Sequence, residues 1–354
     1  IAYWKRSALS IVMQVNLISD TVTRPSKAML EQMMKAPVGD DVFKEDPSVN
    51  ALEAKVAQLF GKEAALLFPS GTMANQTAIK LHTNPGDQLI CDHYAHVFNY
   101  EGGGVSFNSG VSCATIVGER GRITAEQIQA RINPKDFYHS PKTALVVLEN
   151  TTNKGGGACY DPQEIKRIAA LCQKENLSLH LDGARIWNAM IATKTTPAFY
   201  GEHFDTISVC FSKGLGAPIG SALIGSKEMI DQALRVRKIL GGGMRQAGYL
   251  AEAASYAIDH HWQETAQDHV KARELGAAVM AIDGVRYLAP VDTNIVIFEL
   301  ASSQLEDEFM AYMTQSGIQL ISMGSGKLRF VTHRDYTDEQ HQYVLSCIQQ
   351  FKFS

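Results

Sequence analysis

The chain of 354 residues is long enough to bury a sizeable core and to form about two domains. Its hydrophobic content of 45%, charged content of 20% and net charge of −4 are typical of a soluble globular protein. It has no block of basic residues and no apolar run of about 18 residues, so we expect neither nucleic acid nor a membrane as a partner.

The six cysteines are scattered and form no CxxC pair, which predicts reduced thiols in a cytoplasmic protein. No cluster of metal ligands is apparent, so we expect no metal. Residues 1–12 lack the cleavage pattern of a signal peptide, and Met13 can serve as a natural start. We interpret residues 1–12 as an N-terminal extension outside the fold.

Strand-like and helix-like segments alternate from residue 13 to residue 262, which predicts a large α/β domain with a mostly parallel central sheet flanked by helices. A helix is expected at 47–60, with Asp46 as its N-cap, Pro47 in its first turn and Gly61 at its end. Expected strands are 64–68, 143–150, 177–182 and 207–212, and a turn after the first of them leads into a helix.

Residues 263–354 predict a smaller C-terminal α+β domain. Its expected order is a helix, a strand at 293–300, a helix at 303–317, strands at 318–322 and 327–333, and a last helix. Thr337 and Gln340 form the capping box that predicts where this last helix begins.

Lys213 stands at the end of the expected strand 207–212 and is followed by a glycine-rich segment. Burial penalises an ammonium ion, so a lysine at this place either reaches solvent or loses its proton. An unprotonated lysine can form a Schiff base with an aldehyde.

Asp182 ends the expected strand 177–182, one strand–helix–strand unit before Lys213. At the carboxyl edge of a parallel sheet, where ligands bind, its carboxylate can keep a pyridine nitrogen protonated. Arg185 can then reach a phenolic oxygen of the same ring. The alternative is that Asp182 caps the next helix and pairs with Arg185 at the surface.

Three further features can belong to the same site. Gly71 and Thr72 lie between a strand and a helix, where exposed N–H groups bind phosphate. His96 can stack on a planar ring, and Arg329 can bind a substrate carboxylate through two hydrogen bonds. An ordinary turn, a structural histidine and a solvent-facing arginine are the alternatives. Taken together with the lysine and the strand-end carboxylate, these features indicate a pyridoxal-phosphate enzyme acting on amino acids.

Six motifs occur in one order along the chain, namely "SDTVTRPS", "GDDVFKEDPSVNALE", "FPSGTMAN", "LHLDGARIWNA", "FSKGLGAPIGS" and "GGGMRQAG". In these motifs the chain resembles the low-specificity L-threonine aldolases, which are fold-type-I pyridoxal-phosphate enzymes grouped with the β-eliminating lyases. The resemblance extends over nearly all of the chain after residue 15.

The resemblance implies which residues hold pyridoxal 5′-phosphate. Lys213 matches the lysine that carries the cofactor. Arg245 matches an arginine that contacts the phosphate across a subunit interface, with Lys238 as a less secure neighbour. The cofactor-binding residues implied are Gly71, Thr72, His96, Asp182, Arg185, Lys213 and Arg245.

The resemblance also implies that Ser19 and Arg329 bind the substrate carboxylate and that His96 and His139 are catalytic histidines. His139 matches only if one residue is inserted nearby. A homotetramer, a dimer of dimers with shared active sites, is implied as well. The family often has histidine where Thr152 stands in "ENTTN", so substrate preference is the property most open to change.

The implied reaction is retro-aldol cleavage of a small amino-acid substrate, L-threonine or L-allo-threonine, to glycine and an aldehyde such as acetaldehyde. The base for the β-hydroxyl proton can be His96, His139 or a water molecule that they hold. A β-eliminating lyase or an aldolase for bulkier β-hydroxy amino acids is the alternative. A dinucleotide-binding dehydrogenase is disfavoured because no G-x-G-x-x-G follows a strand.

Overall fold

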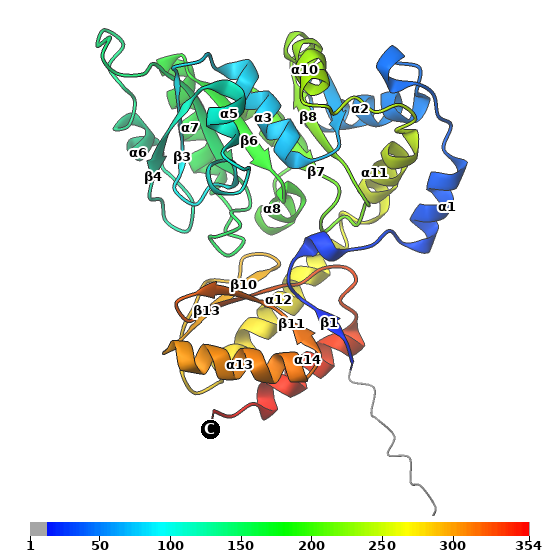
Figure 1. Ribbon diagram of the computed structural model, residues 1–354, viewed down its shortest axis with the longest axis vertical. Helices are drawn as coiled ribbons and strands as arrows, with labels where there is room; N and C mark the ends of the chain where they lie inside the picture. Colours follow the sequence, from blue (N-terminus) through cyan, green and yellow to red (C-terminus); the bar gives the residue numbers. More distant parts are fainter. Residues whose placement is uncertain (1–12, 354) are drawn as a thin grey trace, which may run out of the picture.

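The computed structural model describes residues 13–353, so the interpretation of residues 1–12 lies outside the described residues. A large unit with a seven-stranded sheet lies above a smaller unit with a four-stranded sheet (Figure 1). Each unit has its own principal hydrophobic core. The chain passes from one unit to the other between Gly248–His260 and Thr265–Met280, and our proposed boundary at residue 262 falls in this connection.

The predicted α/β class and the mostly parallel sheet are confirmed. The elements of the large unit are η1 (Asp20–Val22), α1 (Lys27–Lys35), η2 (Asp41–Phe43), α2 (Pro47–Phe60), β2 (Ala64–Phe68), α3 (Gly71–His82), β3 (Gln88–Asp92), α4 (His96–Asn99), α5 (Gly104–Ser109), β4 (Ser112–Ile116), α6 (Ala125–Gln129), β5 (Thr143–Glu149), α7 (Pro162–Glu175), β6 (Ser178–Gly183), α8 (Ile186–Thr193), α9 (Pro197–His203), β7 (Thr206–Cys210), β8 (Ser221–Gly225), α10 (Lys227–Ile239) and α11 (Gly248–His260).

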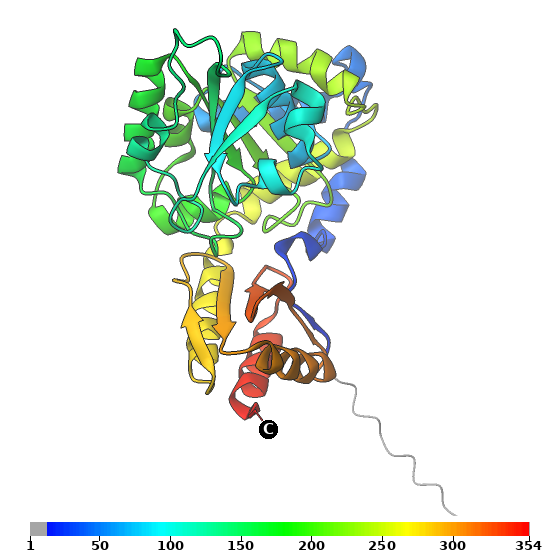
Figure 2. The same cartoon turned by 60° about the vertical axis from the view of Figure 1, so that its left-hand side comes forward.

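The strand order of the large sheet is β2-β8-β7-β6-β5-β3-β4, with helices on both sides (Figure 2). Strand β8, which was not predicted, runs antiparallel to both β2 and β7, and all other neighbours are parallel. In the register of the sheet, Glu149 of β5 is level with Asp182 of β6, and Asp182 is level with Ser208 of β7. Polar side chains from three strands therefore meet in one row at the carboxyl edge.

The predicted helix at 47–60 is confirmed as α2. The side chain of Asp46 accepts a hydrogen bond from the N–H of Val49, Pro47 occupies the first turn, and Gly61 has the positive φ of 64° that ends the helix. Residues spaced along one face of α2 are buried in the large core, which fixes this helix against the sheet.

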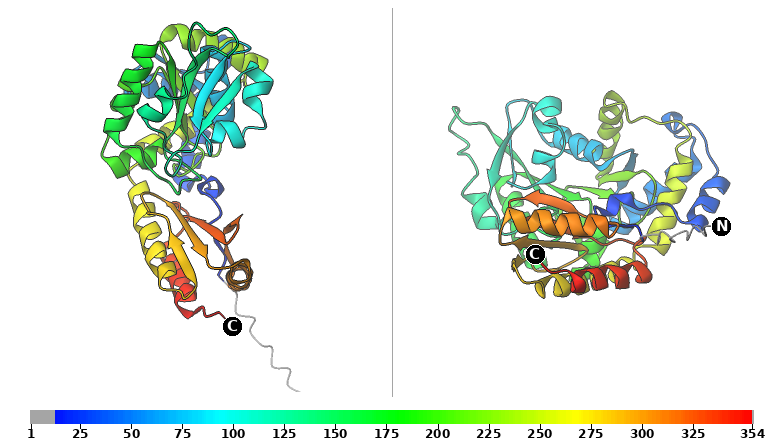
Figure 3. Two further views of the ribbon diagram at one scale, coloured as in Figure 1. Left: turned by 90° about the vertical axis from the view of Figure 1, so that its left-hand side faces the viewer. Right: turned by 60° about the horizontal axis from the view of Figure 1, so that its bottom comes forward.

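The small unit consists of α12 (Thr265–Met280), β9 (Val285–Leu288), β10 (Ile295–Leu300), α13 (Ser303–Gln315), β11 (Ile318–Gln319), β12 (Ile321–Gly324), β13 (Lys327–Val331) and α14 (Asp338–Gln350). Its sheet has the order β12-β13-β10-β9 and is antiparallel throughout. Helices α12, α13 and α14 share one core with β10 and β13 and cover one face of this sheet (Figure 3). The opposite face lies against the loop of Gly156 and Gly157.

Two features of the small unit differ from the expectation. The expected strand 318–322 is divided into β11 and β12. The short strand β1 (Val15–Asn16) pairs in parallel with β11, so the first described residues pack with the small unit and not with the rest of segment 13–262. The reason is that Val15 and Leu17 bury their side chains in the core of the small unit.

The predicted capping box of α14 is present, and it allows a test of the fold. The hydroxyl of Thr337 accepts the N–H of Gln340, whose side chain accepts the N–H of Thr337. We expect Thr337→Ala to lower the free energy of unfolding by about 1 kcal/mol, whereas Thr337→Ser keeps the hydroxyl and loses only a few tenths. Urea unfolding measures both, and equal stability of the two variants would contradict the capping role.

Candidate active site

Lys213 follows β7 directly and lies at the carboxyl edge of the large sheet. Its Nζ lies 3.5 Å from Sγ of Cys210, and the hydroxyl of Thr23 donates to its carbonyl at 2.8 Å. Within residues 13–353, Lys213 makes no salt bridge. The amine therefore has no carboxylate at salt-bridge distance that would occupy it, and a ligand can reach it.

Asp182 is 2% exposed at the end of β6. Its Oδ1 accepts the N–H of Ala184 at 3.1 Å, and its Oδ2 accepts Nδ2 of Asn75 at 3.0 Å. Among the described residues, no salt bridge reaches this carboxylate. A buried carboxylate that receives only neutral donors retains a strong affinity for a cation, and a protonated ring nitrogen is such a cation.

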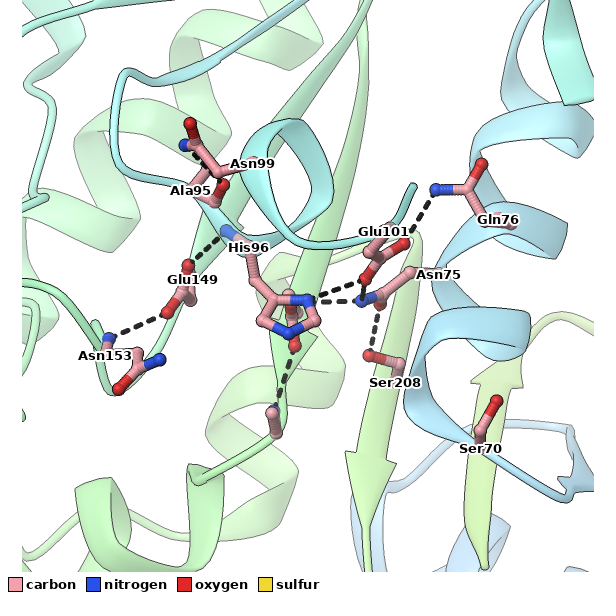
Figure 4. Close-up of polar contacts among 12 residues, drawn as sticks. Ser70, Asn75, Gln76, Ala95, His96, Asn99, Glu101, Glu149, Asn153 and Ser208 are labelled. Carbon is pink, nitrogen blue, oxygen red and sulfur yellow. Dashed lines mark hydrogen bonds and ion pairs between the residues drawn. The ribbon is translucent and has the colours of Figure 1, made fainter. Parts of the chain in front are cut away.

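His96, Asn75 and Glu101 meet in one cluster (Figure 4), and Asp182 lies beside them. Nδ1 of His96 lies 3.0 Å from Oε1 of Glu101, and the same oxygen accepts Nδ2 of Asn75 at 2.9 Å. The second oxygen of Glu101 accepts Nε2 of Gln76 at 2.6 Å. Asn75 thus donates to Asp182 and Glu101 at once and keeps the two carboxylates apart.

His96 is held in place from two sides. Its backbone N–H donates to Glu149 at 2.7 Å, and its ring donates to Glu101. Burial lowers the pKa of His96, but the hydrogen bond that its ring donates to Glu101 and the charges of Asp182 and Glu149 outweigh burial and raise the pKa. The ring is 31% exposed and therefore keeps an accessible edge for a partner.

Glu149 is a site residue that the sequence analysis missed. Burial and the charge of Asp182 raise the pKa of Glu149 to about 7, although the N–H groups of Asn153 and His96 oppose the shift. Glu149 stands at the start of the quoted motif "ENTTN", so its place at a strand end was the available signal.

Arg185 is buried and pairs with Asp20, not with Asp182. Its Nε and Nη2 donate to the two oxygens of Asp20 at 2.8 and 2.7 Å. Burial alone would raise the pKa of Asp20. The charges of Arg185 and, after it, Lys213 outweigh burial and lower the pKa from 3.8 to about 2. Asp20 was also missed, although it lies in the motif "SDTVTRPS" beside the predicted residue Ser19.

Arg329 lies on the inner strand β13, is 8% exposed, and points toward the large unit. It donates to Oδ1 of Asn153 at 2.8 Å and to the carbonyl of Ile18 at 3.0 Å. Its Nε is buried without a hydrogen-bond partner in the described chain, so one donor remains for a ligand. Ser19 follows Ile18 directly, and its hydroxyl accepts from the backbone N–H of Thr21 at 3.2 Å.

Thr152 turns away from these residues. Its hydroxyl donates to the carbonyl of Arg120 at 2.8 Å, and it bridges Ala158 across the loop. The side chain that replaces the family's histidine therefore stabilises the loop, and the following residue, Asn153, contacts Arg329.

Gly71 and Thr72 form the first turn of α3, with Ser70 as N-cap. A Cβ atom on Gly71 would lie 2.8 Å from Sγ of Cys210, so only glycine allows the helix to begin so close to β7. The free N–H groups of this turn therefore open at the same sheet edge as Lys213, as a phosphate site requires.

Arg245 and His139 lie outside this group within one protomer. Arg245 is 56% exposed and pairs with Asp40, and Lys238 packs against the neighbouring Gly243. His139 is exposed in the loop before β5, at the sheet edge opposite to Asp182. The roles of Arg245 and His139 therefore stay predictions that need a neighbouring subunit.

Within residues 13–353, one group of side chains has the spacing of metal ligands. It consists of His96, Glu101 and Asp182, whose ligand atoms lie within 4.8 Å of one another. The amide NH₂ of Asn75 already bridges the two carboxylates, which places a donor where a cation would need acceptors. No helix of the described chain is long and apolar enough to cross a membrane.

Pyridoxal phosphate fits these residues. The carboxylate without a cation, the amine without an anion, the open helix turn and the unpartnered Nε of Arg329 match the ring nitrogen, the aldehyde, the phosphate and the carboxylate of a bound amino acid. Arg185 donates to Asp20 through Nε and Nη2. A contact with the phenolic oxygen therefore falls to its third nitrogen, Nη1.

The Asp20–Arg185 pair allows a test of the site. Asp20→Asn leaves a buried guanidinium without its anion, so we expect the free energy of unfolding to fall by about 3–5 kcal/mol. Asp292→Asn breaks the more exposed pair with Arg120 and is expected to cost about 1 kcal/mol or less. Urea unfolding at neutral pH measures the loss of unfolding free energy in Asp20→Asn and in Asp292→Asn.

The pH dependence of this effect has a defined sign. The pKa of Asp20 is lowered from 3.8 to about 2, so its stabilisation is complete above pH 3.8 and is lost as the pH falls toward 2. The stability difference between wild type and Asp20→Asn should therefore shrink below that pH. A difference that stays constant would show that the ion pair is not its source.

Residues 16–303 match the model of the β-eliminating lyase family. The chain is 38% identical over 346 residues to low-specificity L-threonine aldolase 1 of Arabidopsis thaliana, covering 96% of this chain and 97% of the relative. It is also 38% identical over 334 residues to the low specificity L-threonine aldolase of Escherichia coli K12, covering 92% and 96%.

Solved structures give the same fold. A threonine aldolase of Leishmania major superposes with a TM-score of 0.81 at 22% identity, covering 94% of this chain and 98% of that one. A serine palmitoyltransferase of Sphingomonas wittichii superposes with a TM-score of 0.73 at 18% identity, covering 95% and 86%. The expected fold-type-I architecture is confirmed, and the chain belongs to the low-specificity L-threonine aldolase group of the β-eliminating lyase family.

Proposed function

We propose that this protein cleaves L-threonine and L-allo-threonine to glycine and acetaldehyde, with Lys213 as the residue that binds the cofactor. It is a pyridoxal-phosphate-dependent carbon–carbon lyase. The observation that carries the residue assignment is that two side chains without a salt-bridge partner among the described residues lie at one sheet edge, the buried carboxylate of Asp182 and the amine of Lys213.

Pyridoxal phosphate, when bound, supplies an electron-accepting ring for the electrons of the Cα–Cβ bond that breaks. Asp182 holds a positive charge at the ring nitrogen, and the N–H groups of Gly71 and Thr72 hold the phosphate. His96 packs its ring beside this position, because Glu101 and Glu149 fix both its side chain and its backbone.

Arg329 and Ser19 bind the carboxylate of the amino acid. The free Nε of Arg329 and its fixed Nη contacts orient the guanidinium, so a carboxylate docks in one direction. This orientation sets which bond of the substrate stands perpendicular to the cofactor ring.

His96, or a water molecule that it holds, accepts the proton of the β-hydroxyl group. Its Nδ1 is engaged by Glu101, so Nε2 is the atom that takes the proton. The raised pKa of His96 favours this acceptance. Of the histidines predicted to be catalytic, His96 is the one that a single protomer places beside Asp182, whereas His139 depends on a neighbour.

Replacing Lys213 tests the assignment. We expect Lys213→Ala to lower turnover more than about 10⁴-fold, because losing the nucleophile should exceed the loss of one general base. Lys227→Ala, which removes an exposed lysine paired with Asp231, is the control and should keep wild-type rates.

The same assay decides the reaction class. Initial rates on both threonine isomers are measured with glycine and acetaldehyde quantified. Pyruvate and ammonia in their place would indicate a β-eliminating lyase, and a preference for larger substituents would indicate an aldolase for bulkier substrates. Near-normal turnover of Lys213→Ala would contradict the assignment of Lys213 as the residue that binds the cofactor.

A homotetramer, a dimer of dimers with shared active sites, is part of the proposal. Apolar side chains of η2 and α10 are exposed in the single chain, namely Val42, Phe43 and Ile239. Such a cluster is typical of a covered interface, and Val42 lies against Gly243 in the loop that carries Arg245. We propose that Arg245 and Lys238 reach the phosphate of the neighbouring subunit from this loop.

Mixing inactive subunits tests the shared site. If Arg245 serves its neighbour, Lys213→Ala and Arg245→Ala subunits should form mixed dimers with one complete site each. Activity should then recover to about a quarter of wild type at equal mixing. No recovery after verified subunit exchange would place Arg245 in its own site.

We further propose a cytoplasmic location and a contribution to threonine breakdown and glycine supply. All six cysteines are free in the structure, which suits a reducing compartment.

A further inference from the structure

A chain of buried polar side chains runs beneath α3 on the large sheet, from the end of α3 to Asp182. Nε2 of His82 lies 2.8 Å from Oγ1 of Thr206, which lies 2.9 Å from Nδ1 of His180. Nε2 of His180 lies 3.1 Å from Oδ1 of Asn75, whose Nδ2 donates to Asp182. The mechanism above gives no role to the first three residues.

The direction of every hydrogen bond in this chain follows from its last member. Asn75 must turn its NH₂ group toward Asp182 and Glu101, because both are acceptors. Its Oδ1 then faces Ser208, which donates at 2.6 Å, and His180 (Figure 4 shows Asn75 between Glu101 and Ser208). Nε2 of His180 must therefore carry a proton.

The remaining protons are assigned in the same way. Burial lowers the pKa of His180 to about 3 and that of His82 to about 4, so both rings are neutral at physiological pH. With its proton on Nε2, His180 has a bare Nδ1, so the hydroxyl of Thr206 donates to it. That hydroxyl then accepts from Nε2 of His82. All of the donors point toward Asp182.

The far end of the chain is accessible. His82 lines a cavity of about 760 Å³ at the opposite edge of the sheet, together with Lys166, His203 and Asp205. The chain therefore connects a partly exposed histidine to the buried carboxylate of the candidate active site.

We propose that His82, Thr206 and His180 are positioning residues whose one-directional hydrogen bonds add a second donor to the oxygen of Asn75, reinforce the orientation that Asp182 and Glu101 select, and thereby hold Asp182 ready for the cofactor's ring nitrogen. The proposal rests on the role assigned to Asp182 under the proposed function. Breaking the chain frees His180 to place its proton on Nδ1, where the carbonyl of Thr206 lies 3.2 Å away. Nε2 would then repel Oδ1 of Asn75, and the amide would be held by Ser208, Glu101 and Asp182 alone, with more freedom to move.

Thr206→Val breaks the chain with little change of shape. We expect the dissociation constant of pyridoxal phosphate to rise about tenfold, equivalent to ~1.4 kcal/mol. We also expect the pH midpoint of the bound cofactor's absorption band to shift by about half a unit or more, because that midpoint depends on the charge at Asp182. The matched control is Thr77→Val in α3, since Thr77 is fully buried and its hydroxyl has no hydrogen-bond partner among the described residues.

His82 provides a second test if Thr206→Val does not fold. His82→Phe removes the first donor and should shift both quantities in the same direction by a smaller amount. His82→Gln keeps an N–H donor and should restore them. Melting of the apoprotein is measured in parallel, because a merely structural role would lower the melting temperature and leave the pH midpoint unchanged.

Asp182→Asn separates the two levels of the proposal. If Asp182→Asn alters the affinity and the absorption band while Thr206→Val and His82→Phe behave as Thr77→Val does, the chain is not a positioning device, although the site assignment stands. If Asp182→Asn itself leaves both quantities unchanged, the role of Asp182 fails, and the proposal built on it fails too.

Discussion

The site depends on a negative charge that is buried at Asp182 without a positive partner in the protein. The carboxylate accepts hydrogen bonds from neutral donors, the N–H of Ala184 and the amide of Asn75, and no cation of the described chain occupies it. A lysine or arginine at salt-bridge distance would have satisfied it permanently. The surrounding N–H groups stabilise the carboxylate of Asp182, and the position of its counter-ion is left open for a ligand.

The neighbouring charges are separated accordingly. Arg185, the nearest strong cation in sequence, is paired with Asp20 and therefore does not neutralise Asp182. Glu101 and Glu149 are occupied by His96 and by backbone N–H groups. Asp20, Glu101 and Glu149 each have their own hydrogen-bond donors. Several acidic side chains can therefore share one buried edge of the sheet.

The site also joins the two units of the protein. Asp20 binds Arg185 of the large unit and Asn294 of the small unit, and Arg329 of the small unit binds Asn153 of the large one. The substrate carboxylate is expected between them. The contacts of Asp20 with Arg185 and Asn294, and of Arg329 with Asn153, thus set where Arg329 lies relative to Asp182.

The sequence by itself determined the alternation of strands and helices, the start of α2 and of α14, and the candidate residues for the chemistry, because caps, periodicity and motif order are local signals. It did not determine the antiparallel strand β8, the pairing of β1 with β11, or the partners Asp20, Asn75, Glu101 and Glu149. These were decided by the tertiary structure. A polar side chain acquires its partner only when distant strands come into register, and Asn75 meets Asp182 across 107 positions of the chain.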